Sequence, residues 1–208
     1  MHERDKVMGQ VRAALKDLPE SERTPLPDWP TELVVSRKAP AETSPEALWA
    51  AFKRHFEAVH GDPIEALADI PDFLKAKEAT EGYLDPALDA AVGDLLREAG
   101  LVVHHSFDRE QADRYSFGIT RAMGLIAETG SIILQDKLTS DRLAFIAPWL
   151  HVALVPADLI FETLPAALAE LRDDPYYTIA TGPSKTADIE GILIEGVHGP
   201  GVQACCRI

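Results

Sequence analysis

The segment His151-Val152-Ala153-Leu154-Val155 is the clearest of six short apolar runs in the C-terminal half of the chain. The other five are residues 101–103, 125–127, 131–134, 177–180 and 192–194. Short runs without polar alternation are typical of strands covered on both faces, and residues 161–171 supply one covering helix. The pattern predicts an α/β fold in which helices sandwich a mostly parallel sheet.

The first half of the chain predicts helices instead. A helix over residues 3–17 would place four apolar side chains on one face, at Val7, Val11, Leu15 and Leu18. Six prolines between residues 19 and 45 then exclude a continuous helix or a central strand. We therefore expect a helical N-terminal extension over residues 1–43, with this helix and a proline-rich arm, and an α/β domain over residues 44–208.

Proline next to a capping residue marks helix starts within the α/β domain. Helices are expected from Ser44-Pro45, after Asp62-Pro63, near Pro71 and from Asp85-Pro86. Glycines stop two of them, Gly61 the first and Gly100 the last.

The composition limits the partners. The chain has 208 residues, and its 34 acidic against 20 basic side chains give a net charge of −14, which repels phosphate backbones. We therefore expect no nucleic-acid partner. No apolar run approaches the length of about 18 residues needed to span a membrane, and the N-terminus lacks the apolar core of a signal peptide. We expect a cytoplasmic protein without a transmembrane segment.

Cysteine and histidine give no metal site. Cys205 and Cys206 are neighbours in a closing segment, residues 202–208, whose alternation predicts a half-buried strand with Cys206 in the core. His104 and His105 are adjacent in a strand, so their side chains point to opposite faces and cannot chelate one ion. We expect no metal or other cofactor bound by this chain.

The stretch Gly182-Pro183-Ser184-Lys185-Thr186 follows the apolar run at 177–180, read as a buried strand, and residues 186–190 can open a helix. A strand-to-helix junction exposes backbone N–H groups and the positive end of the helix dipole. We expect it at the carboxyl edge of the sheet, with a small anionic ligand bound by Ser184, Lys185 and Thr186. The alternative is an ordinary capped helix start.

Two further residues belong to this region. Asp188 is the next acidic residue, and its expected role is helix capping or dipole stabilisation. His198 lies in a second special turn, Gly196-Val197-His198-Gly199-Pro200, where its imidazole either reaches a ligand or stabilises the turn.

Residues 118–134 carry the third motif, Gly-Ile-Thr-Arg-Ala-Met-Gly-Leu-Ile-Ala-Glu-Thr-Gly-Ser-Ile-Ile-Leu. Together with the turns at 182–190 and 196–200, in that order and spacing, it resembles the lactate utilization protein C family, whose members contain a LUD domain. The likeness covers about the last 90 residues. It implies a fold similar to the coenzyme A transferase and ribose-phosphate isomerase group.

The resemblance also implies a function. Members of the family support the oxidation of L-lactate to pyruvate together with iron–sulfur partner proteins, so iron–sulfur clusters are expected in the partners. Glu128 is the candidate catalytic residue, because its turn is similar to the one that carries the nucleophilic glutamate of coenzyme A transferases, with Thr129 in place of asparagine. The expected binding residues around it are Thr120, Arg121, Thr129, Gly130 and Ser131.

The residues leave alternatives open here as well. Glu128 either forms an anhydride or acts as a base, or it only binds backbone N–H groups of the tight turn. Arg121 either binds a carboxylate with its fork, in one crevice with Thr120, or is a surface arginine.

The sequence and the resemblance support two alternative hypotheses about the function. One is an assisting subunit of a lactate-oxidising assembly, in which the N-terminal helix and arm dock on an iron–sulfur partner. The other is an autonomous enzyme or binding protein that uses Glu128 on an acyl thioester, a phosphate ester or a carboxylate.

Overall fold

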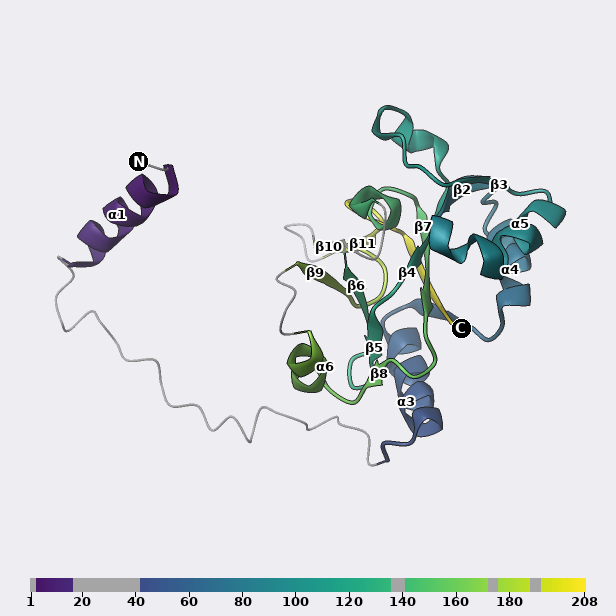
Figure 1. Ribbon diagram of the computed structural model, residues 1–208, viewed down its shortest axis with the longest axis horizontal. Coiled ribbons are helices and arrows are strands. Elements are labelled where there is room, and N and C mark those ends of the chain that lie inside the picture. The colour runs from purple at the N-terminus through teal and green to yellow at the C-terminus, as the bar shows by residue number, and fades with distance from the viewer. Residues whose placement is uncertain (1–2, 17–41, 136–140, 172–175, 188–191) are drawn as a thin grey trace. The chain divides into compact units, whose positions relative to one another are not determined.

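The computed structural model describes residues 3–16, 42–135, 141–171, 176–187 and 192–208 (Figure 1). Chain contacts divide it into two units, Met1–Arg37 and Lys38–Ile208. In the first unit, α1 (Glu3–Lys16) confirms the helix expected over 3–17, and it exposes Val7, Met8 and Val11. The proline-rich arm lies outside the described residues, except at its end, and the boundary at residues 43 and 44 stays a prediction.

A parallel sheet organises the second unit. Its six strands run in the order β1 (Gly61–Ile64), β12 (Val202–Arg207), β7 (Leu150–Val155), β4 (Phe117–Arg121), β2 (Glu81–Leu84) and β3 (Val102–His104). All neighbouring pairs are parallel. The predicted α/β fold with a mostly parallel sheet is therefore confirmed.

One face of this sheet packs on short helices. These are α4 (Ile70–Ala76), α5 (Asp94–Glu98), the 3-10 helix Pro86–Leu88 and the π-helical turn Asp89–Gly93. Leu74 and Leu96 from the helices meet Ile119 and Val152 from the sheet in one buried cluster. The Asp85 cap is confirmed, because its Oδ1 accepts a hydrogen bond from Ala87 N at 3.0 Å.

The other face packs on α3 (Pro45–Ala58) and on a second sheet. That sheet has the order β8 (Ile160–Phe161), β5 (Gly124–Ile126), β6 (Ser131–Gln135) and β9 (Tyr177–Ala180). Phe52 and Phe56 of α3 join Leu125, Ile132 and Val155 in the core. The Ser44 cap of α3 is confirmed by the bond from Ala47 N to Ser44 Oγ, at 3.3 Å.

The structure changes some of the helices expected from the sequence and confirms others. Asp62 and Pro63 themselves lie in strand β1, where Pro63 is tolerated because β1 is an edge strand that pairs with β12. The shorter helix expected after them is the single 3-10 turn Leu67–Asp69. The helix near Pro71 is confirmed as α4. The helix expected over 161–171 is α6 (Leu164–Glu170), and it packs on Ile126 and Ile133 of the second sheet.

The segments near the C-terminus differ from expectation in burial. Strand β9 forms as predicted, but it is an edge strand, and its Thr178 and Ile179 are exposed. In β12 Cys206 lies in the core, as predicted, but Cys205 is fully buried as well, where the alternation had predicted a strand covered on one face. The half-buried pattern was misleading because a glutamine on the second face of β12, Gln203, is buried as well.

The helix expected to open at residues 186–190 is also wrong. Lys185–Ala187 is strand β10, which pairs antiparallel with β11 (Leu193–Glu195). The apolar run at 192–194 supplies a partner strand, so Thr186 pairs with Ile194 instead of starting a helix. Residues 188–191 lie outside the described part of the chain.

Gly130 should be a point of high sensitivity. Its φ is +65°, and an added Cβ would collide with the backbone of His55 and Phe56 in α3. Gly130→Ala should therefore cost roughly 3 kcal/mol, from left-handed strain plus overpacking. The control is Gly100→Ala, where φ is +82° but space is open, at a cost of about 1 kcal/mol. Equal costs in urea unfolding would contradict the close approach.

Candidate functional site

The two turns singled out in the sequence meet in space. Ser184 N donates to Pro200 O at 2.9 Å, and Gly196 N donates to Ser184 O at 2.9 Å. Between them lies a cavity of about 360 Å³, here named the amino-edge cavity. Gly182, Pro183, Ser184, His198 and Gln203 are among its lining residues. The turns at 182–184 and 198–200 therefore line one cavity.

This cavity lies at the amino edge of the parallel sheet. Pro200 precedes β12, and Gly182 packs against Val59 O, just before β1. The prediction of a carboxyl-edge position was wrong, because β9, which leads into Gly182, belongs to the second sheet. Since residues 185–187 form a strand, ligand binding here depends on side chains and turn backbone, and the expected helix dipole has no support in the described residues.

Lys185 has other partners. Its Nζ donates to Val59 O at 3.0 Å and lies 3.5 Å from Glu195 Oε1. Glu195 also contacts His60 Nδ1 at 2.6 Å, and this hydrogen bond is the main cause that holds the pKa of Glu195 below its ordinary value. Lys185 thus joins the hairpin to the end of α3, while Thr186 pairs with Ile194 within the hairpin. Neither residue is part of the cavity lining. Asp188 lies outside the described residues.

A buried polar chain stands behind the cavity. Gln203 of β12 lies 2.8 Å, through Nε2, from Nδ1 of His151 in β7, whose Nε2 lies 2.8 Å from Thr120 Oγ1 in β4. At most 2% of each of the three residues is exposed. The geometry fits a tautomer in which His151 Nδ1 accepts from Gln203 and Nε2–H donates to Thr120. His151 thereby orients the amide of Gln203.

One feature of the sequence points to His151 as a buried polar group. It is the polar residue within an otherwise apolar strand run, and such a residue needs buried partners. Burial lowers the pKa of His151 from 6.5 to about 4, although the hydrogen bond with Gln203 acts in the opposite direction. The imidazole is therefore neutral at pH 7.

Thr120 and Arg121 do not share a crevice. Thr120 points to His151, whereas Arg121 lines a second cavity of about 880 Å³, here named the carboxyl-edge cavity. Arg121 Nε donates to Oδ2 of Asp85 at 3.1 Å, and Asp85 is 1% exposed. Arg121 is therefore held in place by a buried carboxylate and is not an ordinary surface arginine.

The Glu128 turn joins several elements. Glu128 Oε1 accepts a hydrogen bond from Leu164 N, at the start of α6, at 2.9 Å. Thr129 Oγ1 lies 2.6 Å from Ser131 Oγ, which lies 2.7 Å from Thr181 Oγ1 in the wall of the amino-edge cavity. Neither cavity's lining includes Glu128. Its backbone partner belongs to α6 instead of its own turn, and its catalytic role stays a prediction.

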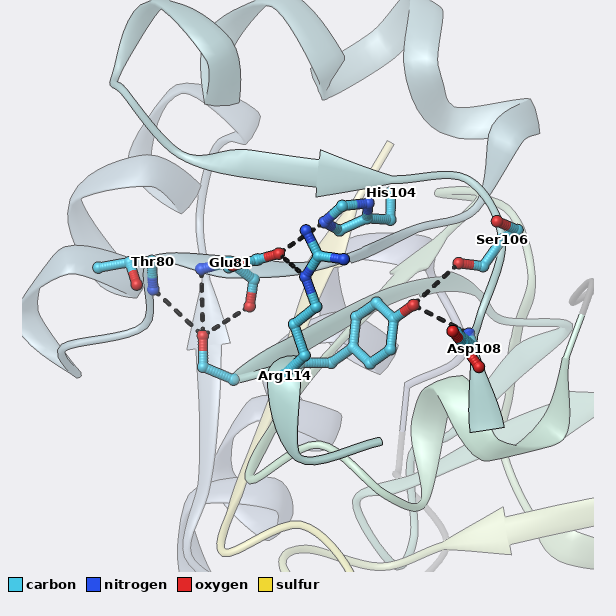
Figure 2. A network of polar contacts seen from close by, with 8 residues as sticks. Thr80, Glu81, His104, Ser106, Asp108 and Arg114 are labelled. Carbon is cyan, nitrogen blue, oxygen red and sulfur yellow. Dashed lines mark hydrogen bonds and ion pairs between the residues drawn. The ribbon is translucent and has the colours of Figure 1, made fainter. Parts of the chain in front are cut away.

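The two adjacent histidines separate, as expected. His104 Nε2 lies 2.8 Å from Glu81 Oε1, to which Arg114 Nε also donates, whereas His105 contacts Leu84 O and Asp89. Figure 2 shows His104 and Arg114 converging on Glu81. The His104 hydrogen bond is the largest cause that lowers the pKa of Glu81. This network ties β2 and β3 to the 3-10 helix Arg109–Arg114.

The thiols and the helices complete the description. Burial raises the pKa of Cys205 well above its ordinary value and that of Cys206 to about 11, so both thiols stay protonated at pH 7. The described ranges contain no cluster of three or more His, Cys, Asp or Glu side chains suited to a metal ion. Within the same ranges, no helix has the length and apolar character needed to cross a membrane.

Comparison with known proteins identifies the family. Residues 51–203 match the LUD domain model, so the chain belongs to the LUD domain family. Its relatives include proteins named lactate utilization protein C. The one from Deinococcus radiodurans is 36% identical over 121 residues, 55% of each chain, and the one from Anoxybacillus flavithermus is 34% identical over 44% of this chain and 43% of its own. In these two matches the chain spans about half the length of the relative or less.

One relative matches nearly the whole chain, and one solved structure has a similar fold. Lactate utilization protein C from Oceanobacillus iheyensis is 23% identical over 96% of this chain and 95% of its own. The crystal structure of a DUF162 family protein from Deinococcus radiodurans superposes with a TM-score of 0.57 at 19% identity, covering 80% of this chain and 99% of that one. At this identity the superposition supports the fold alone.

The neutral state of His151 predicts a pH dependence. The unfolded chain takes up the proton near pH 6.5 and the folded chain only near pH 4, so stability is full above pH 6.5 and falls as the pH drops through this window. Between pH 7.5 and 5.0 the wild type should lose about 2 kcal/mol more than His151→Gln, which does not titrate. Urea unfolding at both pH values measures this, and equal losses in the two proteins would refute it.

Proposed function

We propose that this chain is a subunit of a lactate-utilization system that supports the oxidation of L-lactate to pyruvate together with iron–sulfur partner proteins. The names of its relatives, lactate utilization protein C, support a role in lactate utilization. The partners are those that the family resemblance implies. In this proposal the iron–sulfur clusters of the partner proteins carry the electrons. This chain binds a small anion.

The observation that carries the binding role is the meeting of two sequence motifs at the amino-edge cavity. Its polar lining includes the Ser184 hydroxyl, the His198 imidazole and the Gln203 amide. A volume of about 360 Å³ is at the small end of ligand pockets and exceeds what a three-carbon acid needs. The size and the polar groups therefore fit a small hydroxy acid or oxo acid.

Each group has a role in this proposal. Ser184 Oγ–H and the imidazole N–H of His198 donate hydrogen bonds to the ligand carboxylate, and these bonds are charge-assisted because the carboxylate is ionised. His198 is exposed, so it can meet an incoming ligand. Gln203, fixed by His151, contacts the remaining oxygen of the ligand from the buried side. Lys185 supports the hairpin and is not needed for binding.

The binding role predicts the effect of His198→Gln. Loss of a charge-assisted hydrogen bond should weaken L-lactate binding at least tenfold, as measured by calorimetric titration at pH 6. The matched control is His105→Gln, which lies outside the lining of both cavities and should bind as the wild type does. Pyruvate and phosphate are titrated in parallel. No binding by the wild type, or equal affinity in the two variants, would refute the proposed site.

The partner role rests on α1. Val7 and Val11 lie one turn apart and are exposed, so they offer an apolar stripe to a partner. Val7→Asp with Val11→Asp should abolish co-purification of the iron–sulfur proteins from the native host. Ala13→Asp, on another side of the same helix, should leave it unchanged. Retention of the partners by the double variant would overturn docking through α1.

A further inference from the structure

The carboxyl-edge cavity lies at the carboxyl ends of the parallel strands, whereas the proposed lactate site lies at their amino ends. It opens where β4 ends at Arg121, where Pro156 follows β7 and where Ile208 follows β12. Ala87, just after β2, closes another side. Open parallel sheets bind ligands beyond the carboxyl ends of their strands, so the position is that of a binding site.

The walls of this cavity are mainly apolar. Leu88, Met123, Leu159 and Phe161 are among the lining side chains, together with Ala166 of α6 and Leu171 just after it. Among the described residues of the lining, the polar side chains are Arg121, Gln135 and Glu170. A volume of about 880 Å³ lies near the upper end of the usual range for ligand pockets, so the ligand is larger than a three-carbon acid.

The charges around the cavity do not favour an anion. Arg121 is balanced by the buried Asp85, at 3.1 Å, and Glu170 adds a further negative charge to the lining. An anion would need an excess of positive charge to offset its desolvation in apolar surroundings. The lining therefore fits a neutral molecule.

The polar groups indicate how such a molecule is oriented. Arg121 carries only hydrogen-bond donors, and the amide of Gln135, which is 6% exposed, carries two donors beside its acceptor oxygen. Donors set among apolar walls match carbonyl oxygens on an otherwise apolar ring. We propose that the carboxyl-edge cavity binds a neutral, mainly apolar ring compound with carbonyl oxygens. This site is independent of the proposed binding of lactate at the amino edge.

The test uses the full chain and duroquinone, a fully methylated benzoquinone without a reactive ring position. Equilibrium dialysis should show one bound molecule per chain. Ala166→Trp, at an exposed position of α6 on the cavity wall, should weaken binding at least tenfold because the indole occupies the space. The matched control is Ala169→Trp, on the same helix but outside the lining, which should bind as the wild type does.

Two further ligands separate the recognition of carbonyls from simple apolar burial. Durene, the same methylated ring without carbonyls, should bind at least fivefold more weakly than duroquinone. Tetramethylbenzoate, which carries a charge, should bind more weakly still. Absence of duroquinone binding, equal affinity for durene, preference for the benzoate or equal affinity of the two tryptophan variants would each overturn the proposal. His198→Gln should leave duroquinone binding unchanged, so this test is separate from that of the lactate site.

Discussion

The burial of β7 on both faces is the constraint on which the rest of the structure depends. All six of its residues are buried, and it pairs in parallel with β4 on one side and β12 on the other. Leu150, Val152 and Leu154 face the helical layer, while Ala153 and Val155 face α3 and the second sheet. Removal of either layer would expose a row of aliphatic side chains at about 25 cal/mol per Å², so both layers are required for a stable strand.

The same strand arrangement separates two chemically different edges. Because all six strands run in one direction, their amino ends meet at one edge and their carboxyl ends at the other. At the amino edge, the glycine-rich and proline-rich turns at 182–184 and 198–200 bring Ser184 and His198 to a small cavity whose walls also include Phe145 and Ile146. At the carboxyl edge, α6 and the strand ends enclose a larger and mainly apolar one. One sheet thus borders two cavities of different size, and each is the proposed site of a different ligand.

The sequence predicted the fold better than the site. Apolar runs such as 151–155 identify strands directly, because burial on both faces requires apolar side chains on both. Strands β1, β2 and β4 were missed because Pro63, Gly82 and Gly118 interrupt their apolar character. These glycines are needed where a neighbour leaves no room for a side chain, as at Gly118 against Ala144 O, and such contacts between distant segments are not visible in a local pattern.

The site depended even more on long-range pairing. The turns at 182–184 and 198–200 lie together in the structure, but the helix expected between the two motifs was wrong because β11 pairs with β10. His151 was missed as a polar group, since its partners lie 31 and 52 residues away in the sequence. Its importance follows only from the strand order β12-β7-β4, which brings Gln203, His151 and Thr120 together.

The buried chain couples the state of the core to the proposed ligand site. While His151 is neutral, its Nδ1 accepts from Gln203 Nε2, so the amide has one orientation in the wall of the cavity. A protonated His151 has donors on both nitrogens, and Gln203 must then present its carbonyl oxygen, which already lies 3.2 Å from Nδ1. This flip of the amide would change the group that Gln203 presents to a ligand from the acceptor oxygen to the donor NH2 group. Burial keeps His151 neutral, and Gln203 then presents its acceptor oxygen to the amino-edge cavity. The cavity therefore matches a ligand hydroxyl, which donates, and not a ligand carbonyl, which accepts.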